Sequence, residues 1–126
     1  MTVKTSHLGT GAFLKSEGAG HISRDTIVIA SGSGIVLAGT VLGKITVGGK
    51  YKPYDDDGGE SDDGSRTAAA ILLADVDATD ADAQGVGIVR LAEVWTDRLV
   101  WGAGVTTETE KTNGLADLAA KFVIAR

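Results

Sequence analysis

The two histidines and the absence of cysteine limit the chemistry that this chain could carry out. His7 and His21 are the only histidines, and both lie in a polar, glycine-containing stretch near the N-terminus. Metal ligands and catalytic bases need a rigid scaffold, and a polar stretch that contains glycine is not expected to form one. Disulfides and thiolate metal sites are excluded because the chain has no cysteine. We therefore expect both histidines to be solvated.

Two acidic segments are the next candidates for a metal site. A calcium loop of the EF-hand type needs oxygen ligands at positions 1, 3 and 5, glycine at position 6 and glutamate at position 12. Counting from Asp55 puts Gly59 at position 5 and Arg66 at position 12, and counting from Asp75 puts Asp80 at position 6. Neither segment fits, so we expect solvated loops, no structural metal and no cofactor. Weak cation binding by these loops stays open.

Motifs for phosphate binding and for nucleophilic catalysis are also incomplete. The stretch from Gly39 to Ile45 has three residues between its glycines and isoleucine after Lys44, whereas a phosphate-binding loop has four residues there and serine or threonine after the lysine. Ser33 and Ser61 do not lie in a G-x-S-x-G elbow. We predict that the protein is not an enzyme, although a carboxylate pair assembled in space stays open.

Composition narrows the class of protein further. The chain has 126 residues, a net charge of −5, 18 glycines and only six aromatic residues. It has no basic stripe, so we expect no nucleic-acid partner and no membrane partner. A core built mainly from alanine, valine, isoleucine and leucine is thin, and a thin core favours assembly with other subunits.

The elements that would position any site are predicted to be mostly short β-strands. Apolar or β-branched runs separated by glycine turns predict strands at 26–30, 35–38, 41–47, 51–54, 67–74, 86–94, 99–101 and 123–124. Pro53 places the fourth of these at an edge or at a strand end. Thr107 and Glu110 form a capping box that begins one helix. Its predicted buried face is Leu115, Leu118, Ala119 and Phe122.

The first 25 residues differ from the remainder of the chain. They are rich in glycine, serine, threonine and lysine, and their apolar residues follow no helical period. We predict an extended or flexible arm over residues 1–25 and a single β-rich domain over residues 26–126. The residues expected to bind a partner are the spaced apolar residues of the arm and the first β-competent run after it, namely Leu8, Phe13, Leu14, Ile22, Ile27, Val28 and Ile29.

Several segments, taken together and in order, resemble a known family. They are residues 23–46 (SRDTIVIASGSGIVLAGTVLGKIT), 49–51 with 53–54, 70–78 (AILLADVDA), 89–94 (VRLAEV), 99–101 and 115–126. This ordered set covers about four fifths of the chain and resembles the phage lambda-type head decoration proteins. The glycine-rich arm and the Asp-rich loop 55–66 depart from the pattern of lambda's own protein.

The resemblance implies a β-clip-type fold and a homotrimer on the outer surface of the virion, made in the host cytoplasm. Such trimers occupy three-fold and quasi-three-fold positions of an expanded head and stabilise it. The partner is the major capsid protein, which the N-terminal arm contacts, often by adding a strand. Two other classes stay open from the residues alone: a calcium-stabilised extracellular binding module and a small accessory domain of an enzyme.

Overall fold

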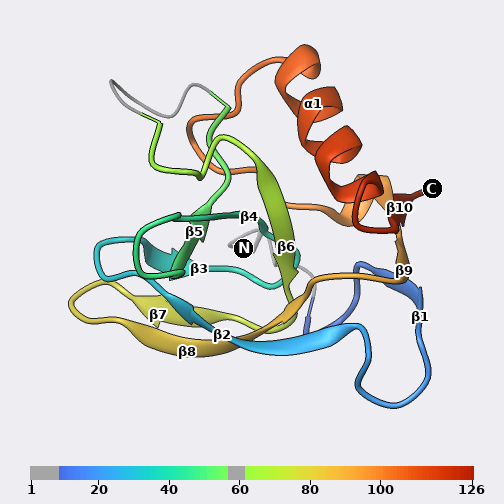
Figure 1. Ribbon diagram of the computed structural model, residues 1–126, viewed down its shortest axis with the longest axis horizontal. Coiled ribbons are helices and arrows are strands. Elements are labelled where there is room, and N and C mark those ends of the chain that lie inside the picture. The colour runs from blue at the N-terminus through green and yellow to red at the C-terminus, as the bar shows by residue number, and fades with distance from the viewer. Residues whose placement is uncertain (1–8, 57–61) are drawn as a thin grey trace, which may run out of the picture.

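A computed structural model describes residues 9–56 and 62–126, and in this part the chain is mostly β (Figure 1). The elements in chain order are β1 (Leu14–Glu17), β2 (Arg24–Ile29), β3 (Gly34–Val36), β4 (Val41–Lys44), β5 (Tyr51–Pro53), β6 (Ala68–Leu72), β7 (Val76–Ala78), β8 (Ala83–Ile88), β9 (Ala92–Val94), the 3₁₀ turn η1 (Thr96–Arg98), α1 (Glu108–Ala119) and β10 (Val123–Ala125). The predicted fold class, a mostly β chain with a small barrel and one helix, is confirmed.

Five strands close into a small barrel in the order β2-β5-β4-β6-β8. The longest pairing is antiparallel, between β2 and β8, and runs from Arg24↔Ile88 to Ile29↔Ala83. Closure comes from a short parallel contact, Ile29↔Tyr51 between β2 and β5. Every residue of β6 is buried. The barrel is therefore a filled core, as expected for so few short strands.

Small residues allow the strands and loops of the barrel to approach closely. A Cβ atom on Gly43 would lie 2.6 Å from the Cα atom of Ser65, so only glycine fits at this point of β4. Ser65 is itself fully buried, and its hydroxyl donates to Asp63 Oδ1 over 2.6 Å. Glycine is therefore needed here for the close approach of a strand and a loop, in addition to its use in turns.

Outside the barrel lie a three-stranded sheet and a two-stranded sheet. In the larger sheet β9 is central, with β1 antiparallel on one side and β10 parallel on the other. The helix α1 lies above the barrel and leads directly into β10 (Figure 1). The smaller sheet pairs β3 with β7, with Ile35 opposite Asp77.

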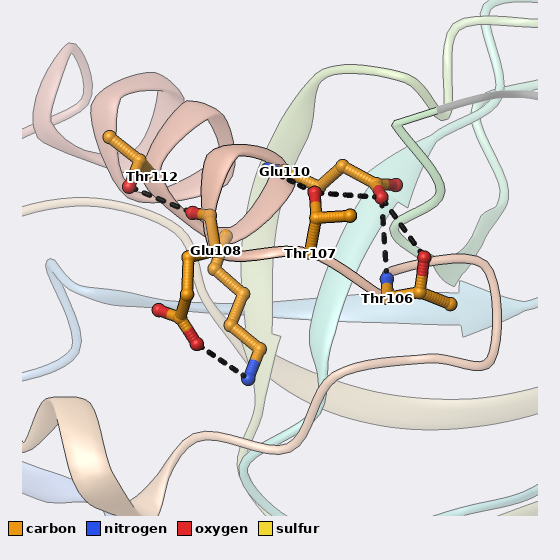
Figure 2. Close-up of polar contacts among 6 residues, drawn as sticks. Thr106, Thr107, Glu108, Glu110 and Thr112 are labelled. Atoms are coloured by element: carbon orange, nitrogen blue, oxygen red, sulfur yellow. Dashed lines mark hydrogen bonds and ion pairs between the residues drawn. The ribbon is translucent and has the colours of Figure 1, made fainter.

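The predicted capping box is confirmed at Thr107, whereas the Glu110 side chain accepts from the amide of Thr106 and not from that of Thr107 (Figure 2). Thr107 Oγ1 accepts a hydrogen bond from Glu110 N at 3.2 Å, which satisfies a free amide at the helix start. Glu110 Oε1 in turn accepts from Thr107 Oγ1 at 3.0 Å and from Thr106 Oγ1 at 3.2 Å. In the next turn Thr112 Oγ1 donates to the carbonyl of Glu108 over 2.9 Å. These bonds fix where α1 begins.

The predicted buried face of the helix is only partly correct. Leu118 is buried and Leu115 packs against the core, but the other buried helix residues are Glu110 and Gly114. Phe122 is 67% exposed because α1 ends at Ala119 and Phe122 has a φ of 62°, so the helical period no longer applies to it. The helix therefore rests on the barrel through its glycine side.

Several predicted strands have different limits in the structure, and the strand predicted over 99–101 is reduced to a single bridge between Val100 and Thr40. The strand expected over 41–47 ends at Lys44. The strand expected over 86–94 is divided into β8 and β9, because Leu91 adopts a φ of 52° between them. The acidic segment that begins at Asp75 was expected to be a solvated loop, and it contains β7 and leads into β8.

Candidate functional site

The predicted partner-binding residues fall into three environments. Leu8 lies outside the described residues. Phe13, Ile27 and Ile29 are buried at 1%, 5% and 0% exposure. Leu14 and Val28 are half-buried, and Ile22 is 49% exposed. The structure therefore does not bring these residues together as one exposed site.

The N-terminal segment from Gly9 onward is attached to the body at several points. Gly11 N donates to the carbonyl of Leu73 over 2.9 Å, and Trp95 N donates to the carbonyl of Phe13 over 2.8 Å. β1 continues this attachment by pairing with β9. Part of the predicted extended or flexible arm, from Gly11 to Glu17, therefore lies against the barrel and β9. Residues 1–8 lie outside the described part.

Phe13 is held in the larger of the two core clusters. Its neighbours in that cluster include Val41, Val94 and Leu99, from β4, β9 and the segment after η1. Burial of an aromatic ring is a major source of stability in a core with few aromatics. Phe13 can therefore contact a partner only if β1 leaves the body.

A buried serine that no local pattern marks holds the turn between β1 and β2. Ser23 is 0% exposed, accepts a hydrogen bond from Gly18 N at 2.8 Å and donates to the carbonyl of Leu91 over 2.8 Å. The turn is also held by the ion pair between Arg24 and Glu17, 2.7 Å long, which lowers the pKa of the Glu17 carboxyl. The bond from Ser23 to Leu91 ties this turn to the β8–β9 corner, and the ion pair joins the end of β1 to the start of β2.

Two strained residues with exposed apolar side chains lie side by side at that corner. Leu91 and Phe122 are the non-glycine residues in the described part of the chain with positive φ, and they are 41% and 67% exposed. Leu91 N donates to the carbonyl of Lys121, and Ala92 N donates to the carbonyl of Phe122. Such backbone conformations cost about 1–3 kcal/mol each for residues of this kind. The surrounding fold therefore enforces them.

Ile22 completes an exposed apolar surface with these two residues. A Cβ atom on Gly18 would contact both the Ile22 side chain and Leu91 Cβ, so these two side chains lie on the same side of the corner. We call Ile22, Leu91 and Phe122 the Phe122 patch. Beside it Lys121 is exposed, and Arg90 donates to the carbonyl of Ile22 over 2.6 Å and is ion-paired with Asp25.

A second exposed apolar surface is a shallow groove beside β3. It has a volume of about 230 Å³, and its walls include Ile35, Pro53, Val100 and Trp101. Ile35 is 68% exposed, and Trp101 makes an edge-to-face contact with Tyr54 with 6.2 Å between ring centres. We call this surface the Ile35 groove.

Polar clusters in the described part have structural partners. The Tyr54 hydroxyl donates to Asp56 Oδ1 at 2.8 Å and also lies 3.2 Å from the carbonyl of Glu110. Burial, followed by the bond to Asp56, raises the pKa of Tyr54 above its usual range, so the hydroxyl stays protonated. Asp63 accepts from Ser65 and pairs with Lys52. These contacts hold the loops around Tyr54 and Ser65 together.

Neither a metal cluster nor a membrane-spanning helix is found in the part of the chain that the structure describes. Within residues 9–56 and 62–126, no three His, Asp or Glu side chains lie close enough together to hold a metal ion. No helix there has the length and apolar composition needed to cross a bilayer. His21 is exposed in the turn before β2, and His7 lies outside the described residues. A further hollow of about 570 Å³ is lined by residues that include Lys52, Tyr54 and Asp55.

Comparison with known proteins identifies the family. No curated protein matches the chain. The family model described as bacteriophage lambda head decoration protein D matches residues 3–123. That family consists of structural, non-enzymatic components of the phage capsid. The match spans nearly the whole chain, including the barrel, the β1-β9-β10 sheet and the helix, so the chain belongs to the head decoration protein D family.

Proposed function

We propose that the protein binds the outside of an expanded tailed-phage capsid as a homotrimer, at three-fold and quasi-three-fold positions, and stabilises the head. The family match over residues 3–123 carries this proposal. The partners are two further copies of the chain and the major capsid protein, and the location is the outer surface of the virion. The net charge of −5 and the thin core agree with a surface protein that is stabilised by assembly.

The proposed capsid contact begins with the residues that precede Gly9. Leu8 is the apolar residue in this part that was predicted to contact the capsid, and the attachment of Gly11 to Leu73 places the start of the body immediately after it. Ordering each backbone residue costs about 1–2 kcal/mol, and the contacts of one short segment offset only part of this cost. Three segments on one trimer bind at high effective concentration, and this offsets the cost.

Expanded empty heads provide the direct test of this function. Purified protein is mixed with expanded heads and, as a control, with unexpanded heads, and bound protein is measured after the heads are sedimented. Saturable binding to expanded heads, with a rise in the temperature at which the heads rupture, supports the proposal. Absence of binding to expanded heads of every phage tested from the same host, including the parent phage, would contradict it.

A deletion tests the segment separately. Removing residues 2–8 keeps every described contact of the body, whereas removing residues 2–22 also removes Phe13 and β1 from the fold. We expect the shorter deletion to leave the melting temperature unchanged and to weaken binding to heads strongly. Leu8→Ser should weaken binding in the same direction. If the shorter deletion binds heads as tightly as the full chain, the capsid contact lies on the body.

A further inference from the structure

A hollow with an excess of positive charge lies between the barrel and the segment that follows α1. It has a volume of about 390 Å³, and its charged walls are Asp25, Lys44, Arg90 and Lys121; we call it the Lys121 hollow. Arg90 is ion-paired with Asp25 over 2.8 Å, so these two charges offset each other. Lys44 and Lys121 are exposed, and neither forms an ion pair in the described part of the chain. The hollow therefore presents two unpaired cations on a chain whose net charge is −5.

The apolar part of the Lys121 hollow is aromatic. Tyr51 is buried in its wall, and Lys44 Nζ lies 5.8 Å from the centre of the Tyr51 ring. Phe122 also lines the hollow, and its side chain is 67% exposed. The backbone of Lys121 and Phe122 is fixed, because the amides of residues 91–92 donate to their carbonyls. A ligand would thus meet a cation and an apolar ring on a backbone that needs no further ordering.

The shape of the surface favours a chain segment over a small ion. The Lys121 hollow adjoins a second hollow of about 330 Å³, which shares the walls Asp25, Lys44 and Tyr51. The second hollow adds residues 48–50, whose lysine is ion-paired with Asp82. A free carboxylate or phosphate would occupy only one end of this surface, whereas an extended segment can follow it.

The charge distinguishes between possible partners. A nucleic acid requires a row of cations along its phosphates, and two unpaired lysines on an acidic chain do not provide one. An anionic bilayer likewise requires a cluster of cations. An acidic protein segment needs only a few carboxylates, which can meet Lys44 and Lys121, and one apolar side chain, which can cover the Phe122 ring. Charge complementarity therefore favours an acidic segment of a protein.

We propose that the Lys121 hollow binds an acidic segment of a partner protein, with carboxylates at Lys44 and Lys121 and an apolar side chain against Phe122. The identity of the partner rests on the proposed function, in which it is the major capsid protein. The contact adds to that of the residues before Gly9, and three copies on one trimer make it at high effective concentration. It also gives the exposed ring and the positive φ of Phe122 a role, because a partner would cover the ring.

Three variants and a matched control test the surface. Lys44→Gln and Lys121→Gln each remove one charge from the hollow. Phe122→Asn removes the ring, and asparagine tolerates the positive φ at this position. Lys15→Gln is the control, because Lys15 is also exposed and lies 5.1 Å from the centre of an aromatic ring, that of Trp95, outside the hollow. Circular dichroism checks that each variant is folded.

A defined peptide measures the chemistry of the hollow without phage heads. The probe is a peptide blocked at both ends, with one leucine between two pairs of glutamates. Its controls are the same peptide with glutamine in place of glutamate, and a short DNA duplex. With the acidic peptide alone, we expect saturable shifts of the backbone amide NMR signals of Lys44 and Lys121.

The variants should change the affinity for this peptide. Lys44→Gln and Lys121→Gln should each weaken binding by about two- to fivefold, the factor for one exposed ion pair, and Lys15→Gln should not. Phe122→Asn should weaken binding in the same direction. The proposal is overturned if the glutamine peptide or the DNA duplex binds there as well as the acidic peptide does. It is also overturned if both lysine variants bind the acidic peptide like the wild type.

Expanded heads test whether the capsid protein is the partner. A chain with both Lys44→Gln and Lys121→Gln should bind heads more weakly than the wild type, and its binding should depend less on salt because two charge contacts are missing. Lys15→Gln should behave like the wild type. If the double variant binds heads with the affinity and the salt dependence of the wild type, the assignment of this surface to the capsid protein is wrong. A wild type that does not bind expanded heads contradicts the proposed function instead, and the peptide measurement then decides on the hollow alone.

Discussion

Replacing Phe13 by alanine should destabilise the folded body by about 3–5 kcal/mol, as expected for truncation of a buried aromatic residue. Phe13 is 1% exposed and packs in the cluster that contains Val41, Val94 and Leu99. Its backbone carbonyl accepts from Trp95 N, and this bond survives the substitution. The loss therefore arises from the missing ring and from the cavity that it leaves.

Urea denaturation followed by circular dichroism measures this effect. The chain concentration must be equal for all variants, because assembly contributes to the apparent stability. Val47→Ala is the control, since Val47 is 88% exposed and its truncation should change the free energy of unfolding by less than about 0.5 kcal/mol. The urea dependence of the unfolding free energy should be unchanged if the variant keeps the native fold.

One result would refute this reasoning. If Phe13→Ala unfolds within about 1 kcal/mol of the wild type and loses binding to expanded heads, Phe13 acts as part of a binding arm and not as a core residue. If the variant is strongly destabilised, the segment from Gly9 onward belongs to the body. Limited proteolysis of the wild type adds a second criterion, because cleavage after Lys15 requires β1 to open.

Further predictions address the helix, the loops and metal dependence. Gly114→Ala should destabilise the protein by about 1–3 kcal/mol in spite of alanine's higher helix propensity, because a Cβ atom there would lie 2.9 Å from the Trp101 ring; thermal unfolding measures the change. Thr107→Ala should cost about 1 kcal/mol through the lost cap, and a wild-type value in the same melts would contradict this. Pairing with Lys52 lowers the pKa of Asp63, so this pair stabilises the fold above the carboxyl pKa of the unfolded chain, about 4, and its contribution is lost as the pH falls below that value. Asp63→Asn should therefore flatten the acid side of a stability–pH curve, and an unchanged acid limb would argue against the pair. A chelator should leave the melting temperature unchanged, whereas a clear decrease would show that an ion is bound.

The strands and the helix start were predictable because their signals are local. A β-branched run predicted β2, an apolar run predicted β6, and the spacing of Thr107 and Glu110 predicted where α1 begins. Pro53 was expected at an edge or at a strand end, and it is the last residue of β5. In each case the neighbours along the chain determine the conformation of the residue, so the sequence alone was sufficient to predict it.

Features that depend on distant contacts were not predictable in the same way. β1 has no apolar alternation of its own and is a strand because β9 lies beside it. β7 contains an aspartate and was expected to be part of a loop, yet it pairs with β3. Ser23 binds Gly18 and Leu91, and nothing in the local sequence marks it. These residues adopt their structure through partners far away in sequence.

Phe122 is a residue on which a local sequence pattern and a distant strand pairing act in opposite directions. Its place after Leu115 and Leu118 predicts a buried helical position, and sequence gives no sign that the helix ends first. The end follows from β10, which must turn back to pair with β9, and Lys121 and Phe122 supply the carbonyls that meet Leu91 and Ala92. The same pairing places Phe122 at positive φ with its ring exposed. The local pattern therefore accounts for the apolar character of this residue, and the distant pairing of β10 with β9 accounts for its exposure.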